Sequence, residues 1–294
     1  MSDARCPLCD GLTAEAFSVG DRNRGIGDGR FTYRRCLRCR VLYEVDPPDD
    51  LGPYYPDDYH QPPDPAELDR HAAAEEPKLA LLRPFAASGR LIDIGSGYGS
   101  FARAARNAGY EVTAIELDAR CCEYLERVVG VRAICSDTPE RELAHLGSTR
   151  VVTLWHVLEH LPRPWDVLAA AAKQLEAGGA LVVATPNPDS LQFRLLRARW
   201  AHVDAPRHLF LIPFAALRDR VRALGLEVGH VTTADSAGRH WNRFGWEYAL
   251  RGCPARRPAK RGTFALSLLV SALLAPIEHR DLKGAAYTAV FVKH

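Results

Sequence analysis

The sequence lacks a segment that would export the chain or anchor it in a membrane. Acidic residues such as Asp3 and Asp10 interrupt its start, so the first residues do not form the basic and apolar stretches of a secretory signal. The longest apolar run, at 264–275, is well short of the roughly 20 residues that a membrane-spanning helix needs. Both absences predict a cytoplasmic protein.

The chain also carries little net charge. Its 294 residues include 38 Lys and Arg against 36 Asp and Glu, which gives a formal charge of +2. This balance provides no large positive field to capture nucleic acid, although it is compatible with a local basic patch. The length is sufficient for one large α/β domain with smaller appendages.

Cysteine is more informative, because four of the eight cysteines stand in two tight pairs. Cys6 and Cys9 form one C-x-x-C pair, and Cys36 and Cys39 form the other. In a reducing compartment such pairs are typical of a metal site rather than of disulfides. Four thiolates fill the tetrahedral coordination of Zn²⁺, so we predict a structural zinc ribbon over residues 1–45.

Strands and helices are expected to alternate after a linker and an N-terminal helix at 46–87. The strands are predicted at 90–94, 111–115, 131–135, 151–155, 180–185 and 227–232, and the helices at 101–108, 119–128, 165–176 and 214–224. We expect Gly178 and Gly179 to close the helix at 165–176. The order predicts a doubly wound, Rossmann-like α/β sheet over residues 88–235, with helices on both faces.

An insertion at 236–284 precedes the last strand, which we place within residues 285–294. It is too long for a plain loop. It contains a basic run at 256–261, and five apolar residues then follow at helical spacing: Leu266, Leu269, Val270, Leu273 and Leu274. We interpret the insertion as a helical lid whose apolar stripe packs on the sheet. The alternative is peripheral membrane contact through residues 256–275.

A glycine-rich turn follows the first predicted strand of the sheet. Gly95, Gly97 and Gly99 would let the backbone approach a ligand, with the first amides of the next helix facing it. The spacing is G-x-G-x-G rather than the G-x-G-x-x-G of dinucleotide enzymes, so a nicotinamide-dependent oxidoreductase is the weaker interpretation. Glu116 ends the next strand about 20 residues further on, where a carboxylate can accept both ribose hydroxyls.

These motifs resemble those of the class I S-adenosylmethionine-dependent methyltransferases. The first motif of that family is an acidic residue followed by three alternating glycines, and Asp93 supplies the acid here. The resemblance places Asp137 where the family holds the adenine amino group, and it covers residues 88–235 with the final strand. It implies that S-adenosyl-L-methionine is the cofactor and that its binding residues are Asp93, Gly95, Gly97, Gly99, Glu116, Asp137, Thr138 and Trp155.

The segment after Trp155 is close to the HVLEHL form of a large subgroup of these enzymes. If a helical turn begins there, His156, Glu159 and His160 share one face at the carboxyl edge of the sheet. A later segment that contains His208 could swing back over the same edge.

This layout resembles a subset of methyltransferases, including small-RNA 2′-O-methyltransferases and ubiquinone-pathway O-methyltransferases, with an E-x-x-E-H motif and one later histidine. There the four residues bind a divalent metal that activates a hydroxyl. The resemblance implies a second metal site at His156, Glu159, His160 and His208, with His156 in place of the first glutamate. Such a set suits Zn²⁺, Fe²⁺ or Mn²⁺ better than Mg²⁺.

The alternative needs no second metal. His156 would then line the cofactor pocket, and Glu159 would pack against a helix or cap one. Either His160 or His208 would act alone as a general base, or neither would act.

The expected activity is methyl transfer to a small-molecule acceptor, a hydroxyl on a sugar or natural-product scaffold. A similar order of ribbon and methyltransferase occurs in bacterial enzymes of secondary metabolite biosynthesis. Four residues after the ribbon could line the acceptor pocket or simply pack on the main domain: Tyr54, Tyr55, Tyr59 and His60.

Two other functions are weighed against this one. An RNA methyltransferase would use the ribbon to bind RNA, since four arginines cluster at the second knuckle: Arg34, Arg35, Arg38 and Arg40. A cofactor-binding module without turnover is the more distant alternative.

Overall fold

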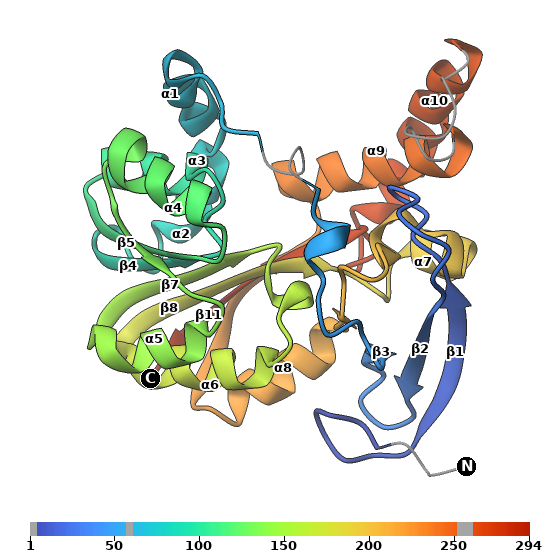
Figure 1. Ribbon diagram of the computed structural model, residues 1–294, viewed down its shortest axis with the longest axis horizontal. Helices are drawn as coiled ribbons and strands as arrows, with labels where there is room; N and C mark the ends of the chain where they lie inside the picture. Colours follow the sequence, from blue (N-terminus) through green and yellow to red (C-terminus); the bar gives the residue numbers. More distant parts are fainter. Residues whose placement is uncertain (1–4, 57–60, 252–260) are drawn as a thin grey trace.

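The computed structural model describes residues 5–56, 61–251 and 261–294, and it contains two β-sheets (Figure 1). The larger sheet has the strand order β10-β11-β8-β7-β4-β5-β6. Strand β11 runs opposite to all the other strands of this sheet. The strands are β4 (Gly89–Ile94), β5 (Tyr110–Glu116), β6 (Arg132–Cys135), β7 (Thr149–Trp155), β8 (Leu175–Pro186), β10 (Leu226–Thr232) and β11 (Ala286–Lys293). This mostly parallel sheet confirms the predicted Rossmann-like fold.

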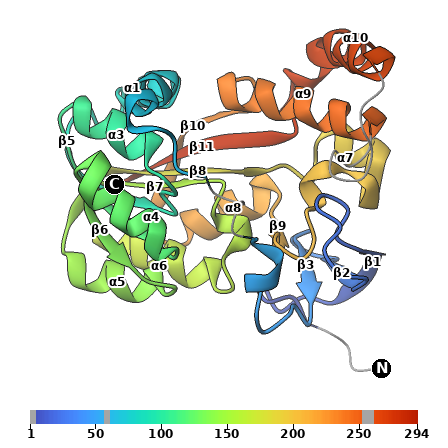
Figure 2. The same ribbon diagram turned by 45° about the horizontal axis from the view of Figure 1, so that its top comes forward.

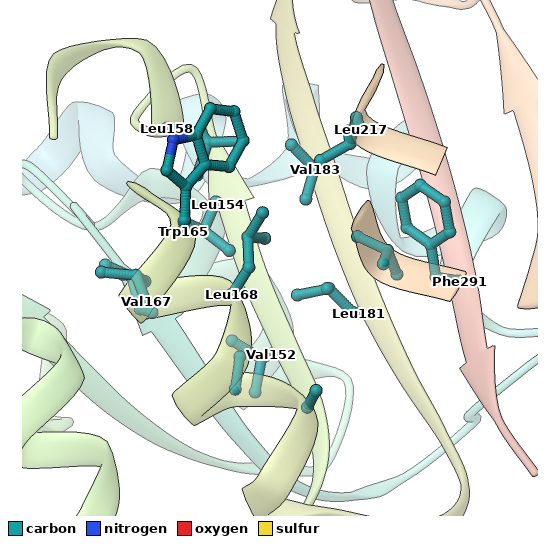
Figure 3. Packing of buried hydrophobic residues seen from close by; sticks show 14 of the residues in the cluster. Val152, Leu154, Leu158, Trp165, Val167, Leu168, Leu181, Val183, Leu217 and Phe291 are labelled. Atoms are coloured by element: carbon teal, nitrogen blue, oxygen red, sulfur yellow. The ribbon is translucent and has the colours of Figure 1, made fainter. Parts of the chain in front are cut away.

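Helices cover both faces of this sheet, and the strands alternate their side chains between two apolar layers. Ile92 and Ile94 of β4 face one layer, whereas Leu91 faces the other. The first layer, shown around Trp165 and Phe291 in Figure 3, is completed by α5 (Pro139–Leu146), α6 (Pro164–Gln174) and α8 (Phe214–Arg222). The second is completed by α1 (Pro65–Ala74), α2 (Glu76–Leu82), α3 (Ser100–Asn107) and the turn Leu125–Val129 that follows α4 (Ala119–Tyr124).

The join between α6 and β8 differs from the prediction. Helix α6 ends at Gln174 and β8 begins at Leu175, so Gly178 and Gly179 lie inside the strand and do not close the helix. A Cβ on Gly179 would lie 2.8 Å from the carbonyl oxygen of Glu176 and 3.0 Å from that of Arg150. These glycines therefore permit a close backbone approach where the β7–β8 register shifts. Helix α5 was also not predicted from the sequence.

The smaller sheet consists of β1 (Thr13–Val19), β2 (Phe31–Cys36), β3 (Leu42–Val45) and β9 (Phe210–Leu211). Its fourth strand comes from the segment that follows β8, because Leu42 of β3 pairs with Leu211 of β9. Tyr33 and Leu42 share an apolar cluster with Trp200 and Leu211. The N-terminal residues therefore share both a sheet and a core with the methyltransferase-like part of the chain.

A buried ion-pair network joins the same two parts. Arg207 is fully buried, and its Nη2 lies 2.7 Å from both Asp21 Oδ1 and Asp204 Oδ1. Its Nη1 also donates to the carbonyl of Tyr54 at 3.2 Å. Two carboxylates thus surround a cation that could not be buried alone without a large desolvation cost.

The insertion is helical, but its apolar stripe does not pack on the sheet. It contains α9 (Ser236–Arg251) and α10 (Arg261–Glu278). Helix α9 takes the place beside β11, where Asn242 accepts the backbone N–H of Ala285 at 2.6 Å, and α10 packs on α9 (Figure 2). Leu266, Leu269 and Leu273 are exposed, so the expectation that this stripe packs on the sheet is wrong.

Most of the basic run at 256–261 lies outside the described residues. Among the helices that the structure describes, none is both long and apolar enough to cross a membrane.

The buried network leads to a stability prediction. We expect Asp21→Asn to lower the free energy of unfolding by about 3 kcal/mol, because it leaves a fully buried guanidinium with one carboxylate instead of two. Urea unfolding followed by tryptophan fluorescence measures this change. The control is Glu227→Gln, which removes the partner of Arg222 in an exposed pair and should cost less than about 1 kcal/mol. Equal losses in the two variants would contradict the proposed importance of the buried network.

Candidate active site

The turn between β4 and α3 contains two packing glycines and one open glycine. Gly95, Gly97 and Gly99 have φ values of +69°, +53° and +77°, in the region that favours glycine. A Cβ on Gly95 would clash with Val157 and one on Gly99 with Leu125, whereas one on Gly97 would meet nothing within 4 Å. Gly97 is therefore the position where a ligand could approach the backbone.

Glu116, at the carboxyl end of β5, lies against this open glycine. Its Oε2 accepts the N–H of Gly97 at 2.8 Å, and its Oε1 accepts the N–H groups of Leu117 and Asp118 at 2.7 and 3.1 Å. The carboxylate is thus fixed beside the turn at the sheet edge where open α/β folds bind ligands. Its role as the ribose acceptor remains a prediction.

The other two acidic residues predicted to hold the cofactor have different surroundings. Asp93 is buried beneath the turn, where its Oδ1 accepts the hydroxyl of Thr153 at 2.6 Å and burial raises its pKa to about 6. Asp137 is exposed just beyond β6, and Thr138 next to it is the N-cap residue of α5. Asp93 therefore supports the turn from below, whereas Asp137 is accessible to a ligand.

Trp155 ends β7 and is surrounded by residues from α2 and α3. Its ring lies edge-on to Phe101, with centroids 5.1 Å apart, and Lys78 Nζ lies 4.8 Å from the Trp155 ring centroid. Lys78 also pairs with Glu75 at 2.5 Å. The sequence did not indicate Lys78 or Glu75, because neither belongs to a recognisable motif.

A second cluster follows directly from β7. The 3₁₀ turn Leu158–His160 places Glu159 and His160 next to His208, and the candidate ligand atoms of these three residues all lie within 4.8 Å of one another. The rings of His160 and His208 have centroids 4.6 Å apart. Val157, just before this turn, packs against the glycine turn, because its side chain occupies the place where a Cβ on Gly95 would lie. The segment with His208 thus returns over the same sheet edge, as expected.

Backbone carbonyls determine which nitrogen of each histidine carries a proton. His160 Nδ1 lies 2.9 Å from the carbonyl oxygen of Arg207, and His208 Nδ1 lies 2.9 Å from that of His202. Because a carbonyl can only accept, each Nδ1 must be the protonated nitrogen in the neutral ring. Both Nε2 atoms then present lone pairs, the arrangement typical of metal ligands and general bases.

Glu159 supplies a buried carboxylate to the same space. It is fully buried, and its Oε2 accepts the hydroxyl of Thr185 at 2.9 Å, while its Oε1 has no hydrogen-bond partner. Burial would raise the pKa of Glu159, but the neighbouring imidazoles, His156 first, lower it to about 2. Burial and His208 lower the pKa of His160 to about 4. At neutral pH the cluster therefore contains a charged carboxylate and a neutral His160.

His156 lies beside this cluster rather than within it. The φ of His156 is +57°, outside the helical region, and the 3₁₀ turn begins only at Leu158. The helical turn that would have placed His156 on one face with Glu159 and His160 therefore does not form. His156 Nε2 accepts the indole N–H of Trp241 at 2.8 Å, and its Nδ1 lies 3.6 Å from Glu159 Oε1. The structure thus brings three of the four predicted ligands together and gives His156 a contact to α9.

Residues from the N-terminal part also contact the histidines. The hydroxyl of Tyr55 lies 3.1 Å from His160 Nδ1, and that of Tyr33 donates to the carbonyl of His208 at 2.6 Å. Tyr59 and His60, also expected near the acceptor, lie outside the described residues. The sequence indicated Tyr55, but it contained no signal for Tyr33, which is part of an ordinary strand pattern.

The four paired cysteines form a separate cluster. Cys6 Sγ lies 3.6 Å from Cys39 Sγ, and Cys9 Sγ lies 3.5 Å from Cys36 Sγ. The two C-x-x-C turns repeat one hydrogen-bond pattern. Asp10 N donates to Cys6 O and Arg40 N to Cys36 O, while Cys6 N donates to Gly11 O and Cys36 N to Val41 O. Two matched knuckles thus point four thiols at one centre.

The chain resembles known methyltransferases in both sequence and structure. Residues 66–231, more than half of the chain, match the family described as a methyltransferase domain. The ubiquinone biosynthesis O-methyltransferase of Marinobacter nauticus is 32% identical over 159 residues, which cover 49% of this chain and 66% of that protein. The protein of the same name from Bordetella avium is 30% identical over 176 residues, which cover 55% and 70%. The chain thus spans about two thirds of the length of these curated relatives.

A solved structure with the same fold is that of a SAM-dependent methyltransferase from Archaeoglobus fulgidus. The TM-score is 0.50 at 19% identity, and the match covers 74% of this chain and 94% of that one. At this identity the likeness shows the fold alone.

The glycine turn leads to a binding prediction. We expect Gly97→Val to abolish binding of S-adenosylhomocysteine in titration calorimetry, because its side chain would fill the open space beside the backbone. Gly225→Val is the control, since Gly225 also has a positive φ, of +85°, and nothing within 4 Å of its Cβ position. Both variants carry a similar backbone strain of about 1–2 kcal/mol. Tight binding by Gly97→Val would reject the site, and tight binding of a nicotinamide dinucleotide instead would reject the cofactor.

Proposed function

The chain belongs to the methyltransferase domain family and has the class I fold of the S-adenosylmethionine-dependent enzymes, and on this basis we propose that it transfers a methyl group from S-adenosyl-L-methionine to a small-molecule hydroxyl. One observation carries the choice of a hydroxyl. One candidate ligand atom from each of Glu159, His160 and His208 lies within 4.8 Å of the others, beside the glycine turn, and Glu159 Oε1 has no hydrogen-bond partner. These proton-accepting side chains suit a methyl acceptor that must lose a proton, such as a hydroxyl.

The surroundings of the cluster favour a ring-shaped acceptor. Tyr55 contacts His160 and Trp241 contacts His156, and both aromatic rings are only half-buried. Aromatic walls with a few convergent polar groups are typical of small-molecule sites. The two curated relatives are named as O-methyltransferases of ubiquinone biosynthesis. We favour a hydroxyl on a sugar or natural-product scaffold.

The residues of the cluster have distinct proposed roles. The sulfonium methyl is already activated, so the protein must align the acceptor oxygen with it and take up the hydroxyl proton. With a pKa near 4, His160 is a weak base at neutral pH, but it remains neutral and can bind a metal. His208 is therefore the base in the version of the mechanism without a metal.

The same residues fit a divalent metal ion. Glu159, whose buried Oε1 has no hydrogen-bond partner, forms a set of one carboxylate and two imidazoles with His160 and His208. This set suits Zn²⁺, Mn²⁺ or Fe²⁺ and leaves coordination positions open. A bound ion would lower the pKa of an acceptor hydroxyl. His156 would then orient Glu159 from the side rather than act as a fourth ligand.

We assign the cysteine cluster to a structural zinc ion. The donor set is four sulfurs, and backbone N–H groups point at them: Leu8 N lies 3.4 Å from Cys6 Sγ, and Arg38 N and Cys39 N lie 3.3 Å from Cys36 Sγ. Such N–H contacts favour thiolates. With all four positions filled by protein, the site has no room for a substrate. We retain residues 1–45 as the proposed ribbon and 88–235 as the proposed catalytic core.

The ribbon offers little support for the RNA alternative. Arg34 donates to the hydroxyl and the carbonyl of Thr13 at 2.8 Å, and Arg35 is half-buried with its guanidinium 5.7 Å from the Phe193 ring centroid. Only Arg38 and Arg40 of the four arginines are exposed. Two of the expected phosphate-binding groups thus serve the internal packing of the N-terminal part.

The histidine cluster leads to an activity prediction. We expect His208→Ala to reduce methyl transfer by about 100-fold or more, because proton removal by a positioned group contributes on that scale. His160→Ala should cost a similar factor if both side chains bind one metal ion. The assay measures labelled methyl transfer from S-adenosyl-L-methionine to phenolic, sugar and RNA acceptors. Affinity for S-adenosylhomocysteine should change little, since the glycine turn and Glu116 form a separate part of the site. The control is His145→Ala, which changes an exposed histidine of α5.

The same assay separates the possible mechanisms. A metal ion requires that activity fall with a mild chelator, that one divalent ion restore it, and that the two histidine variants lose similar factors. Full activity after chelation, with a defect only in His208→Ala, would establish a single general base. Transfer to RNA but not to small molecules would overturn the proposed acceptor. Cofactor binding without any transfer would support the non-catalytic alternative.

The cysteine cluster leads to a metal-content prediction. Elemental analysis should find one tightly held zinc per chain, and Cys36→Ser should lose it. Because β3 pairs with β9 and shares a core with Trp200, we expect this loss to lower the midpoint of one cooperative unfolding transition. Cys135→Ser, at an exposed cysteine, is the control and should change neither quantity. Separate melting of residues 1–45 would show that the ribbon is only appended.

A further inference from the structure

Helix α10 exposes far more apolar surface than packing on α9 requires. Its side chains Leu266, Leu268, Leu269, Leu273 and Ile277 are between 39% and 67% exposed. Leu266, Leu269, Leu273 and Ile277 follow one another at helical spacing along one side of the helix. Among its described side chains only Ser267 and Glu278 are fully buried. A continuous apolar patch of this kind marks an interaction surface rather than an ordinary solvent-exposed helix.

The helix is firmly attached to the rest of the molecule at its C-terminal end. Glu278 is fully buried, and its Oε1 accepts Gln192 Nε2 and Trp246 Nε1, each at 2.9 Å. These contacts tie α10 to α7 (Leu191–Leu196) and α9. In both ribbon views the helix stands out from the body of the protein beyond α9 (Figures 1 and 2). The apolar side chains are therefore presented outward by an anchored element.

Positively charged side chains lie on the α9 side of this apolar surface. A groove of about 450 Å³ runs between α9 and α10, with Leu268 and Ala272 among its walls and Arg239, Arg243 and His279 also lining it. The sequence of α10 has no charged residue from 262 to 277. Of the acids near this groove, Glu278 is buried by the contacts above, and Asp281 lies 3.6 Å from Lys283. Asp235 accepts Gly238 N at 2.6 Å and Thr288 Oγ1 at 2.7 Å, and Glu247 lies on α9 near His240. Arg239 and Arg243 thus place two cationic side chains beside the apolar surface.

We propose that the outer face of α9 and α10 docks on an anionic lipid surface, with the leucines of α10 inserted among the acyl chains and the arginines of α9 at the headgroups. A helix that is apolar along its length and basic at its border is the pattern of interfacial membrane binding. Anionic headgroups would complement Arg239 and Arg243. Two copies of the chain joined through this face would instead bring like charges together, which is unfavourable.

Sedimentation with vesicles tests the proposal without any need for methyl transfer. The full-length protein should bind vesicles of phosphatidylcholine and phosphatidylglycerol in a ratio of about 70:30, and only weakly those of phosphatidylcholine alone. The double variant Leu269→Glu/Leu273→Glu should lose binding at least about tenfold, because two exposed apolar anchors become anionic. The double variant Arg239→Gln/Arg243→Gln should lose the preference for the anionic vesicles.

The matched control is Leu195→Glu, since Leu195 is 63% exposed on α7 and is not part of the apolar side of α10. It should bind vesicles like the unmodified protein. All variants should keep the circular dichroism spectrum, because the substituted side chains are exposed. Equal binding by Leu269→Glu/Leu273→Glu and the unmodified protein would overturn the proposal. It would also be overturned if analytical ultracentrifugation showed a dimer that this variant abolishes, while no vesicle binding is seen.

Discussion

The burial of one arginine is the constraint on which the functional part of this structure depends. The guanidinium of Arg207 cannot be buried without compensating charge, and its two carboxylates come from distant parts of the sequence, Asp21 and Asp204. The carbonyl of the same residue accepts the Nδ1 proton of His160. The ion pair that joins the N-terminal sheet to the larger fold therefore also determines how a candidate catalytic imidazole is oriented.

This arrangement divides the site into two parts with different origins. The class I fold supplies the glycine turn and Glu116 at the edge of the parallel sheet, where cofactors bind in open α/β folds. The additions to that fold supply the walls around the histidines, because Tyr33 and Tyr55 come from the N-terminal part and Trp241 comes from α9. Acceptor preference would then reside in the additions, in line with the general separation of fold from function.

In this arrangement the cysteine knuckles also affect the stability of the histidine cluster. A four-cysteine zinc site usually stabilises only its own small module. Here the strand that follows the second knuckle pairs with β9, which lies just after the segment of Arg207 and His208. A metal that stabilises the knuckles would thereby stabilise the position of the histidines, although it lies outside the reaction.

The sequence by itself determined the parallel sheet, because apolar strands at regular spacing and a G-x-G-x-G turn are local patterns that few folds accommodate. It also indicated the two knuckles, Glu116, and the residues Glu159, His160 and His208, since each belongs to a short motif. The exclusion of His156 from the three-residue cluster was decided by its positive φ and by Trp241, some 85 residues away. The buried role of Arg207 and the exposure of α10 also required the tertiary structure. Burial and partner choice depend on which distant segments meet, and local periodicity contains no information about that.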